Sequence, residues 1–333
     1  MKQIKWWEIF LVVAVVIFVT VSINSEEEVT KNPNIPKIIE PEDMYEGYPF
    51  LNKNGDYAKL DEKSTLTMKT EITDELMING YYSLFPLYAS FAYAVYPEDT
   101  YGEYGSCNGK VICLSDFDAT SGLDSYNPDI VFALGVDGKG ISSAHERENM
   151  TLVAKDALVF HTSVENEMGN ITTEQIKQIY SGDVVKWEEL GIDGEYIIAY
   201  QRDGNTQTML NHFIDGISFT SPPREEYDFH GRERVKIADY RNHKGAIGYS
   251  YRYMTHDLVN KGKMKLLSVD GIVPTDENIR SGKYPFTVEV YAATRDAKKY
   301  KAEVYEAIAE FIEWMQGEQA QQLVTKTGYV SLY

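Results

Sequence analysis

The sequence predicts an α/β fold, because short apolar runs alternate along the chain with segments whose apolar residues recur at helical spacing. Residues 129–134 are such an apolar run, bounded by proline and glycine, and predict a buried strand. Residues 172–180 place Ile176 and Ile179 at helical spacing and predict a helix. With 333 residues, and about 150 residues in a typical domain, the chain is long enough for two domains.

The remaining elements are justified by the same two patterns. An apolar-rich stretch over 71–76 and 84–95 predicts a helix that opens after Gly80, and Thr172 or Thr173 is expected to cap the helix over 172–180. In chain order, the other expected elements are strands at 156–160 and 197–200, a helix at 207–214, strands at 246–249, 265–267 and 286–291, and an amphipathic helix at 299–315.

Composition excludes several classes of protein. Lys and Arg number 32 against 51 Asp and Glu, so the formal charge is −19, which argues against a nucleic-acid binder and against docking on an anionic membrane surface. A hydrophobic fraction of 43% with 25% charged residues excludes wholesale disorder. Two cysteines exclude a disulfide-dense scaffold and any site with four cysteine ligands.

The N-terminal 25 residues predict export. Lys2 and Lys5 precede a Trp pair and the apolar run 9–23, which together come close to the ~20 residues needed to cross a bilayer. Basic residues before the run predict a cytoplasmic N-terminus and an exported remainder. We expect an uncleaved signal anchor, with membrane attachment through residues 6–23, and a cleaved signal peptide is the alternative.

Residues 26–63 predict an extended tether, because they hold four prolines and little helical or strand periodicity. The folded part is expected to begin near Ser64. Cys107 and Cys113 flank an Asn-Gly turn signal, and in an oxidising compartment they are expected to form a disulfide, with two unpaired thiols as the alternative.

No catalytic motif is found in the sequence. The stretch 135–140 is glycine-rich but lacks the spacing and the Ser or Thr of a P-loop, and neither H-E-x-x-H nor G-x-S-x-G occurs. No cluster of carboxylates for a metal, no paired nucleophile and base and no cofactor loop is apparent. We therefore expect a protein that is not an enzyme and has no cofactor.

An anion site is predicted where the strand 197–200 leads into a helix. The turn contains Arg202, small polar residues and a helix that starts near Thr206. A helix N-terminus offers unpaired N–H groups and partial positive charge, and arginine can donate two parallel hydrogen bonds to an oxyanion. The alternative is a capped helix with a surface arginine.

This turn and its surroundings resemble the phosphate-binding proteins of phosphate ABC transporters, which belong to the periplasmic-binding-protein superfamily. The similarity covers about residues 65–333, and the order and spacing of its motifs are more specific than any one of them. It is carried by the segments 78–87, 153–191, 202–213, 244–249, 284–286 and 319–332, and within 153–191 by Asp156, Ala157, Thr172, Gln175, Ile179, Gly182, Trp187 and Gly191.

The resemblance implies a two-lobed α/β fold of the periplasmic-binding-protein type II class, with an anion in the cleft between lobes. Residues 64–157 and 282–333 would form the first lobe, and 158–281 the second. The ligand-binding residues that it implies are Arg202, Thr206, Gln207, Thr208, Ser83, Tyr82 and Asp137.

Three features depart from the family pattern. Tyr81 and Tyr82 precede Ser83 where Ser or Thr is common, the segment 206–208 replaces Ser-Gly-Thr, and Asp137 is the nearest candidate for the acceptor of a phosphate proton.

The function that follows is capture of an oxyanion, inorganic phosphate first, for an ABC importer. The expected partners are phosphate, the permease subunits and the membrane, without nucleic acid, and the protein is expected to be a monomer. The alternatives are a cell-surface sensor or adhesion module with the same fold, and an enzyme acting on phosphate esters.

Overall fold

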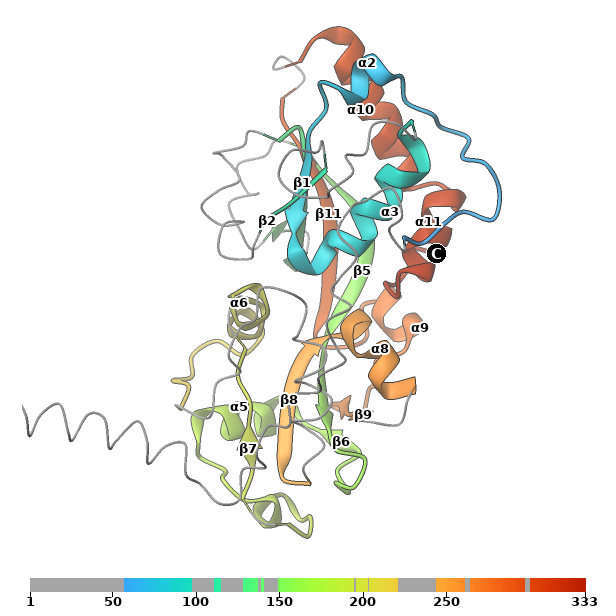
Figure 1. Ribbon diagram of the computed structural model, residues 1–333. Coiled ribbons are helices and arrows are strands. Elements are labelled where there is room, and N and C mark those ends of the chain that lie inside the picture. Colours follow the sequence, from blue (N-terminus) through green and yellow to red (C-terminus); the bar gives the residue numbers. More distant parts are fainter. Residues whose placement is uncertain are drawn as a thin grey trace, which may run out of the picture. The chain divides into compact units, whose positions relative to one another are not determined.

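A mixed β-sheet runs through the folded part of the chain, with helices packed against it (Figure 1). The computed structural model describes residues 57–97, 111–114, 128–136, 139–140, 149–194, 196–202, 204–220, 244–260, 264–296 and 300–333. The predicted signal segment and most of the predicted tether lie outside these residues. Among the described residues, no helix combines the length and the apolar character needed to cross a membrane.

The strands are β1 (Ile78–Tyr81), β2 (Val111–Leu114), β3 (Ile130–Val136), β4 (Lys139–Gly140), β5 (Asn149–Thr162), β6 (Asn170–Ile171), β7 (Ile198–Ala199), β8 (Ala246–Tyr251), β9 (Lys265–Leu266), β10 (Ser268–Val269) and β11 (Thr287–Thr294). The helices are α2 (Thr70–Thr73), α3 (Phe85–Val95), α5 (Thr173–Ser181), α6 (Gly204–Phe213), α8 (Arg252–Asn260), α9 (Asp276–Arg280), α10 (Ala302–Met315) and α11 (Glu318–Lys326), with 3-10 turns η1 (Tyr82–Leu84) and η3 (Trp187–Leu190).

The long strand β5 links two groups of strands. The strand order is β2-β1-β3-β11-β5-β8-β7, with β1 parallel to both β2 and β3, and β7 parallel to β8. From Asn149 to Ala157, β5 pairs antiparallel with β11, and the two strands lie side by side in Figure 1. From Leu158 to Thr162 it pairs with β8 instead. A single strand therefore takes part in both groups, as expected for a strand that crosses between lobes.

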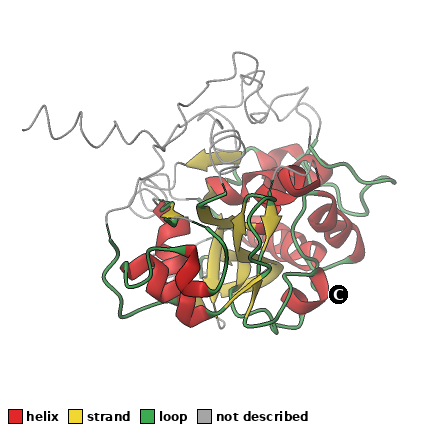
Figure 2. Ribbon diagram, turned by 90° about the horizontal axis from the view of Figure 1, so that it is seen from below, coloured by secondary structure: helices red, strands yellow, loops and turns green. Residues whose placement is uncertain are grey.

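Helices cover the strands on both sides (Figure 2). In the first group, α11 contacts α3 and α10. Its core includes Tyr88 stacked on Phe132 at 5.1 Å between ring centroids, and Phe91 edge-on to Trp314 at 6.0 Å. In the second group, α8 contacts both β5 and β8. Apolar side chains thus form the buried contacts that the alternating sequence pattern predicts.

Most expected elements are present, with shifted ends. The helix expected at 172–180 is α5, and Thr172 caps it: its Oγ1 accepts from the Gln175 N–H at 3.1 Å, while the Gln175 side chain accepts from the Thr172 N–H at 2.9 Å. The long helix expected at 299–315 is α10. Strand β1 was not among the expected elements, which place a helix directly after Gly80.

Gly80 is required in β1 by packing. A Cβ atom at this position would lie 2.8 Å from both the Phe132 Cβ and the Tyr88 Cε1 atom, which is closer than real Cβ contacts allow. The glycine therefore permits close approach of β1 to β3 and α3.

The packed part of the chain starts by Tyr57 rather than near Ser64. Tyr57 is buried and lies 5.3 Å from Tyr93 between ring centroids. Lys326 Nζ donates to the Lys59 carbonyl at 2.8 Å. The last residues assigned to the tether thus lie against α3 and α11.

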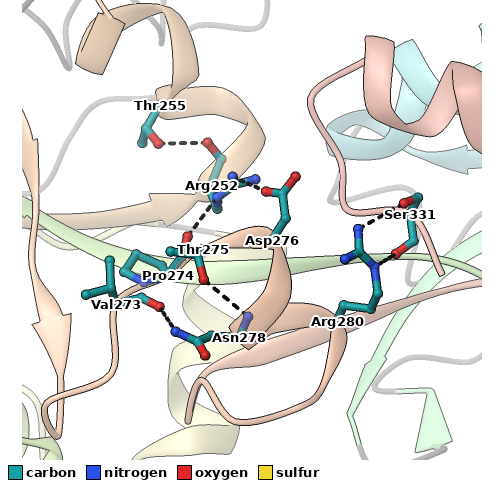
Figure 3. A network of polar contacts seen from close by, with 9 residues as sticks. All are labelled: Arg252, Thr255, Val273, Pro274, Thr275, Asp276, Asn278, Arg280 and Ser331. Carbon is teal, nitrogen blue, oxygen red and sulfur yellow. Dashed lines mark hydrogen bonds and ion pairs between the residues drawn. The ribbon is translucent and has the colours of Figure 1, made fainter. Parts of the chain in front are cut away.

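Arginine side chains form polar contacts at both ends of the short helix α9 (Figure 3). At its start, Arg252 forms an ion pair with Asp276 and its Nε donates to the Pro274 carbonyl at 3.0 Å. At its end, Arg280 Nε donates to the Ser331 carbonyl at 2.9 Å. Arg252 therefore joins the start of α8 to α9, and Arg280 joins α9 to the C-terminal segment.

Candidate functional site

The turn from β7 into α6 is built as the sequence predicts. Strand β7 is followed by Arg202, and α6 begins at Gly204, three residues before the expected start at 207. Arg202 is only 3% exposed, and Thr206 is also buried. The first four N–H groups of a helix have no partner within it, and that of Thr206, the third residue of α6, is among them. This end of α6 can therefore offer backbone donors, a hydroxyl and a guanidinium to one anion.

The two other residues of segment 206–208 differ from Thr206 in their surroundings. The Gln207 side chain bonds to Tyr249 and Asn211: its Oε1 accepts from the Tyr249 hydroxyl, and its Nε2 donates to the Asn211 Oδ1 at 2.8 Å. Thr208 is exposed and is the fifth residue of α6. The Gln207 carboxamide is therefore engaged within the protein.

Tyr249 contacts the turn, although it was not predicted as part of the site. The Arg202 N–H donates to the Tyr249 hydroxyl at 2.9 Å. The signal for it was present, since Tyr249 ends the motif at 244–249 that carries part of the family resemblance. Its role required the fold, because the two residues lie 47 positions apart.

The first predicted ligand loop lies between β1 and α3. Tyr82 opens the 3-10 turn η1, and its side chain lies outside the described part. Ser83 is buried, and its hydroxyl has no hydrogen-bond partner among the described residues. The Ser83 carbonyl accepts from the Tyr329 hydroxyl, and the Tyr329 ring stacks on Tyr253 at 4.5 Å. A buried hydroxyl without a partner, at the start of a helix, is suited to an external acceptor.

The structure thus brings Arg202, Thr206 and Gln207 together at one turn, and it places Ser83 on a separate element that also follows a strand. Asp137 lies outside the described residues, so its role as acceptor stays a prediction. The disulfide stays a prediction as well, because Cys107 and the side chain of Cys113 lie outside the description. Within the described ranges, no three His, Cys, Asp or Glu side chains converge on a metal site.

Comparison with known proteins identifies the family. Residues 137–319, more than half of the chain, match the family model described as the PBP superfamily domain. The phosphate-binding protein PstS of Bacillus subtilis is 30% identical over 168 residues, which are 48% of this chain and 50% of that protein. PstS of Borreliella burgdorferi is 27% identical over 194 residues, 55% of this chain and 65% of that protein. The chain therefore spans less than two thirds of either relative.

Solved structures show the same fold. An ABC-type phosphate transport receptor from Vibrio cholerae superimposes with a TM-score of 0.58 at 17% identity, covering 77% of this chain and 99% of the other. PstS from Borrelia burgdorferi gives 0.51 at 20% identity, covering 77% and 98%. These similarities confirm the predicted two-lobed α/β fold. With its sheet order and the match over 137–319, this chain belongs to the PBP superfamily.

Proposed function

We propose that this protein is an extracytoplasmic substrate-binding protein that captures inorganic phosphate for an ABC importer. The observation that carries the proposal is the buried Arg202 just before the N-terminal end of α6, together with the buried Thr206 four residues later. Two relatives named as phosphate-binding proteins support phosphate as the anion. The relatives are binding proteins, which supports a receptor rather than an enzyme.

The acidic charge of the chain is compatible with an anion receptor. A formal charge of −19 slows long-range attraction of phosphate, whereas affinity depends on donors inside the closed site. Arg202 supplies one full positive charge and a planar set of donors. The Thr206 N–H, the Thr206 hydroxyl and the Ser83 hydroxyl would surround the other oxygens, and Gln207, Thr208, Tyr82 and Asp137 remain further candidate ligands.

Export and membrane attachment through residues 6–23 belong to the same proposal, and they rest on the charge asymmetry and apolar run of the N-terminus. The permease subunits of the importer would be its protein partners, and the receptor would act as a monomer.

Calorimetric titration of the full-length chain with phosphate and with sulfate tests the proposal. Arg202→Ala is expected to weaken phosphate binding about tenfold to a hundredfold, because a charge-assisted hydrogen bond contributes roughly 1.5–3 kcal/mol. Arg295→Ala removes one positive charge from a partly exposed arginine after β11 and serves as the control. Its affinity should match that of the wild type.

Two results would change the proposal in different ways. Equal affinity of Arg202→Ala and wild type would place the anion elsewhere. If the wild type binds neither anion, the receptor function is wrong, and a sensor or adhesion module with this fold should replace it.

A further inference from the structure

Tyr249 contacts the turn that carries Arg202, and its hydroxyl bonds to both sides of that turn. We propose that Tyr249 is a positioning residue of the anion site, which holds Arg202 and the start of α6 in the arrangement that binds the anion. The proposal rests on the proposed function, since it concerns how the same site is kept in place.

A chain of three hydrogen bonds spans the turn. The Arg202 N–H donates to the Tyr249 hydroxyl at 2.9 Å, and that hydroxyl donates to the Gln207 Oε1. The Gln207 Nε2 then donates to the Asn211 Oδ1 at 2.8 Å. A phenolic hydroxyl can accept and donate at the same time. One group on β8 therefore sets the position of Arg202, three residues after the end of β7, relative to the first turns of α6.

The ring that carries this hydroxyl is held independently of the turn. Tyr249 is fully buried, at 0% exposure, in β8, which pairs with β5 on one side and β7 on the other. Its ring lies edge-on to Tyr180 at 5.4 Å and near Phe160 at 6.1 Å between centroids. Because the sheet and two aromatic rings fix it, its hydroxyl is a stable reference point for the turn. Such preorganisation lowers the ordering cost of binding.

The same contacts assign a role to Gln207. Its carboxamide accepts from the Tyr249 hydroxyl and donates to Asn211, so the side chain links β8 to the next turn of α6. Glutamine reaches this hydroxyl from a position one turn into the helix, whereas a glycine or a threonine would be too short. The Gln at position 207, which departs from the family pattern, then supports the site through its side chain.

The test is phosphate titration of the full-length chain in mild detergent, with Tyr249→Phe as the main variant. The ring is retained, but the buried Arg202 N–H loses this acceptor, so phosphate binding should weaken about tenfold. Tyr284→Phe is the matched control, because Tyr284 is also buried and its hydroxyl has no hydrogen-bond partner among the described residues. Its affinity should equal that of the wild type.

A double-mutant cycle separates positioning from general support of the core. If Tyr249 acts by placing Arg202 and the start of α6, adding Tyr249→Phe to Arg202→Ala should weaken binding less than adding it to the wild type does. An equal loss in both backgrounds, or an unchanged affinity of Tyr249→Phe, would overturn the positioning role while the proposed function stands. Should Tyr249→Phe fail to fold, Gln207→Leu removes the acceptor from the other side, with about threefold weaker binding expected. Unchanged affinity there would overturn the role too.

A wild type that binds no phosphate is the separate outcome. In that case the proposed function itself fails, and the role of Tyr249 fails with it.

Discussion

Replacing Asp156 by asparagine should change how stability depends on pH. Asp156 lies on β5 opposite Val288 of β11 and is 1% exposed. Burial raises the pKa of its carboxyl from 3.8 to about 7, although the Ala157 N–H, the Arg252 charge and the Tyr253 N–H each act to lower it. The charge of Asp276 raises it further. Neither carboxyl oxygen has a hydrogen bond of good geometry with a described residue, so its charged form is poorly compensated.

The direction of the effect follows from proton binding. Between about pH 4 and pH 7 the folded state holds a proton that the unfolded state has lost, so the free energy of unfolding falls as the pH rises. Above about pH 7 Asp156 is ionised in both the folded and the unfolded state, and the stabilisation from its bound proton is completely lost. A pKa difference of about three pH units corresponds to roughly 4 kcal/mol, of which about 2.5 kcal/mol is lost between pH 5 and pH 8.

Urea unfolding at pH 5, 6, 7 and 8, followed by circular dichroism, measures this effect. Asp156→Asn removes the titration, so its stability relative to the wild type should rise by about 2–3 kcal/mol from pH 5 to pH 8. A constant cost of burying the amide would shift all points equally and leave that rise intact. Asp215→Asn, at an exposed aspartate, is the control and should show no such rise. Parallel curves for Asp156→Asn and wild type would contradict the reasoning.

Two further predictions concern stability. Gly182 follows the last residue of α5 and has a φ angle of +83°, and an added Cβ atom would lie 2.4 Å from the Thr220 Cγ2. Gly182→Ala should therefore lower the free energy of unfolding, measured with urea, by more than about 2 kcal/mol. Gly191 has a φ angle of +78° but no atom within 4 Å of an added Cβ, so Gly191→Ala should lower the free energy of unfolding by only about 1 kcal/mol. Equal losses for the two variants would show that the contact with Thr220 is unimportant. Lys301→Ala breaks an ion pair with Glu75, and the two side chains are 74% and 50% exposed. Because exposed ion pairs contribute little, the free energy of unfolding should fall by less than about 0.5 kcal/mol in the same assay, and a fall of more than about 1 kcal/mol would refute this.

The sequence determined the elements whose signal is local. The cap of α5 by Thr172 follows from residues three positions apart, and the strand–turn–helix around Arg202 follows from an apolar run, a polar turn and helical spacing. Strand β1 could not be predicted in this way, because Gly80 is explained by the approach of Phe132 and Tyr88, which arrive from other elements.

The tertiary structure alone decided how the candidate site is supported. Tyr249 lies 47 residues after Arg202, and Tyr329 lies 246 residues after Ser83, so neither hydrogen bond leaves a trace in local periodicity. The insertion of β11 between β3 and β5 is likewise set by sheet pairing between distant segments. Local patterns specify which elements form, because caps and apolar spacing act within a few residues. Which side chains meet depends on how the sheet joins strands far apart in the chain.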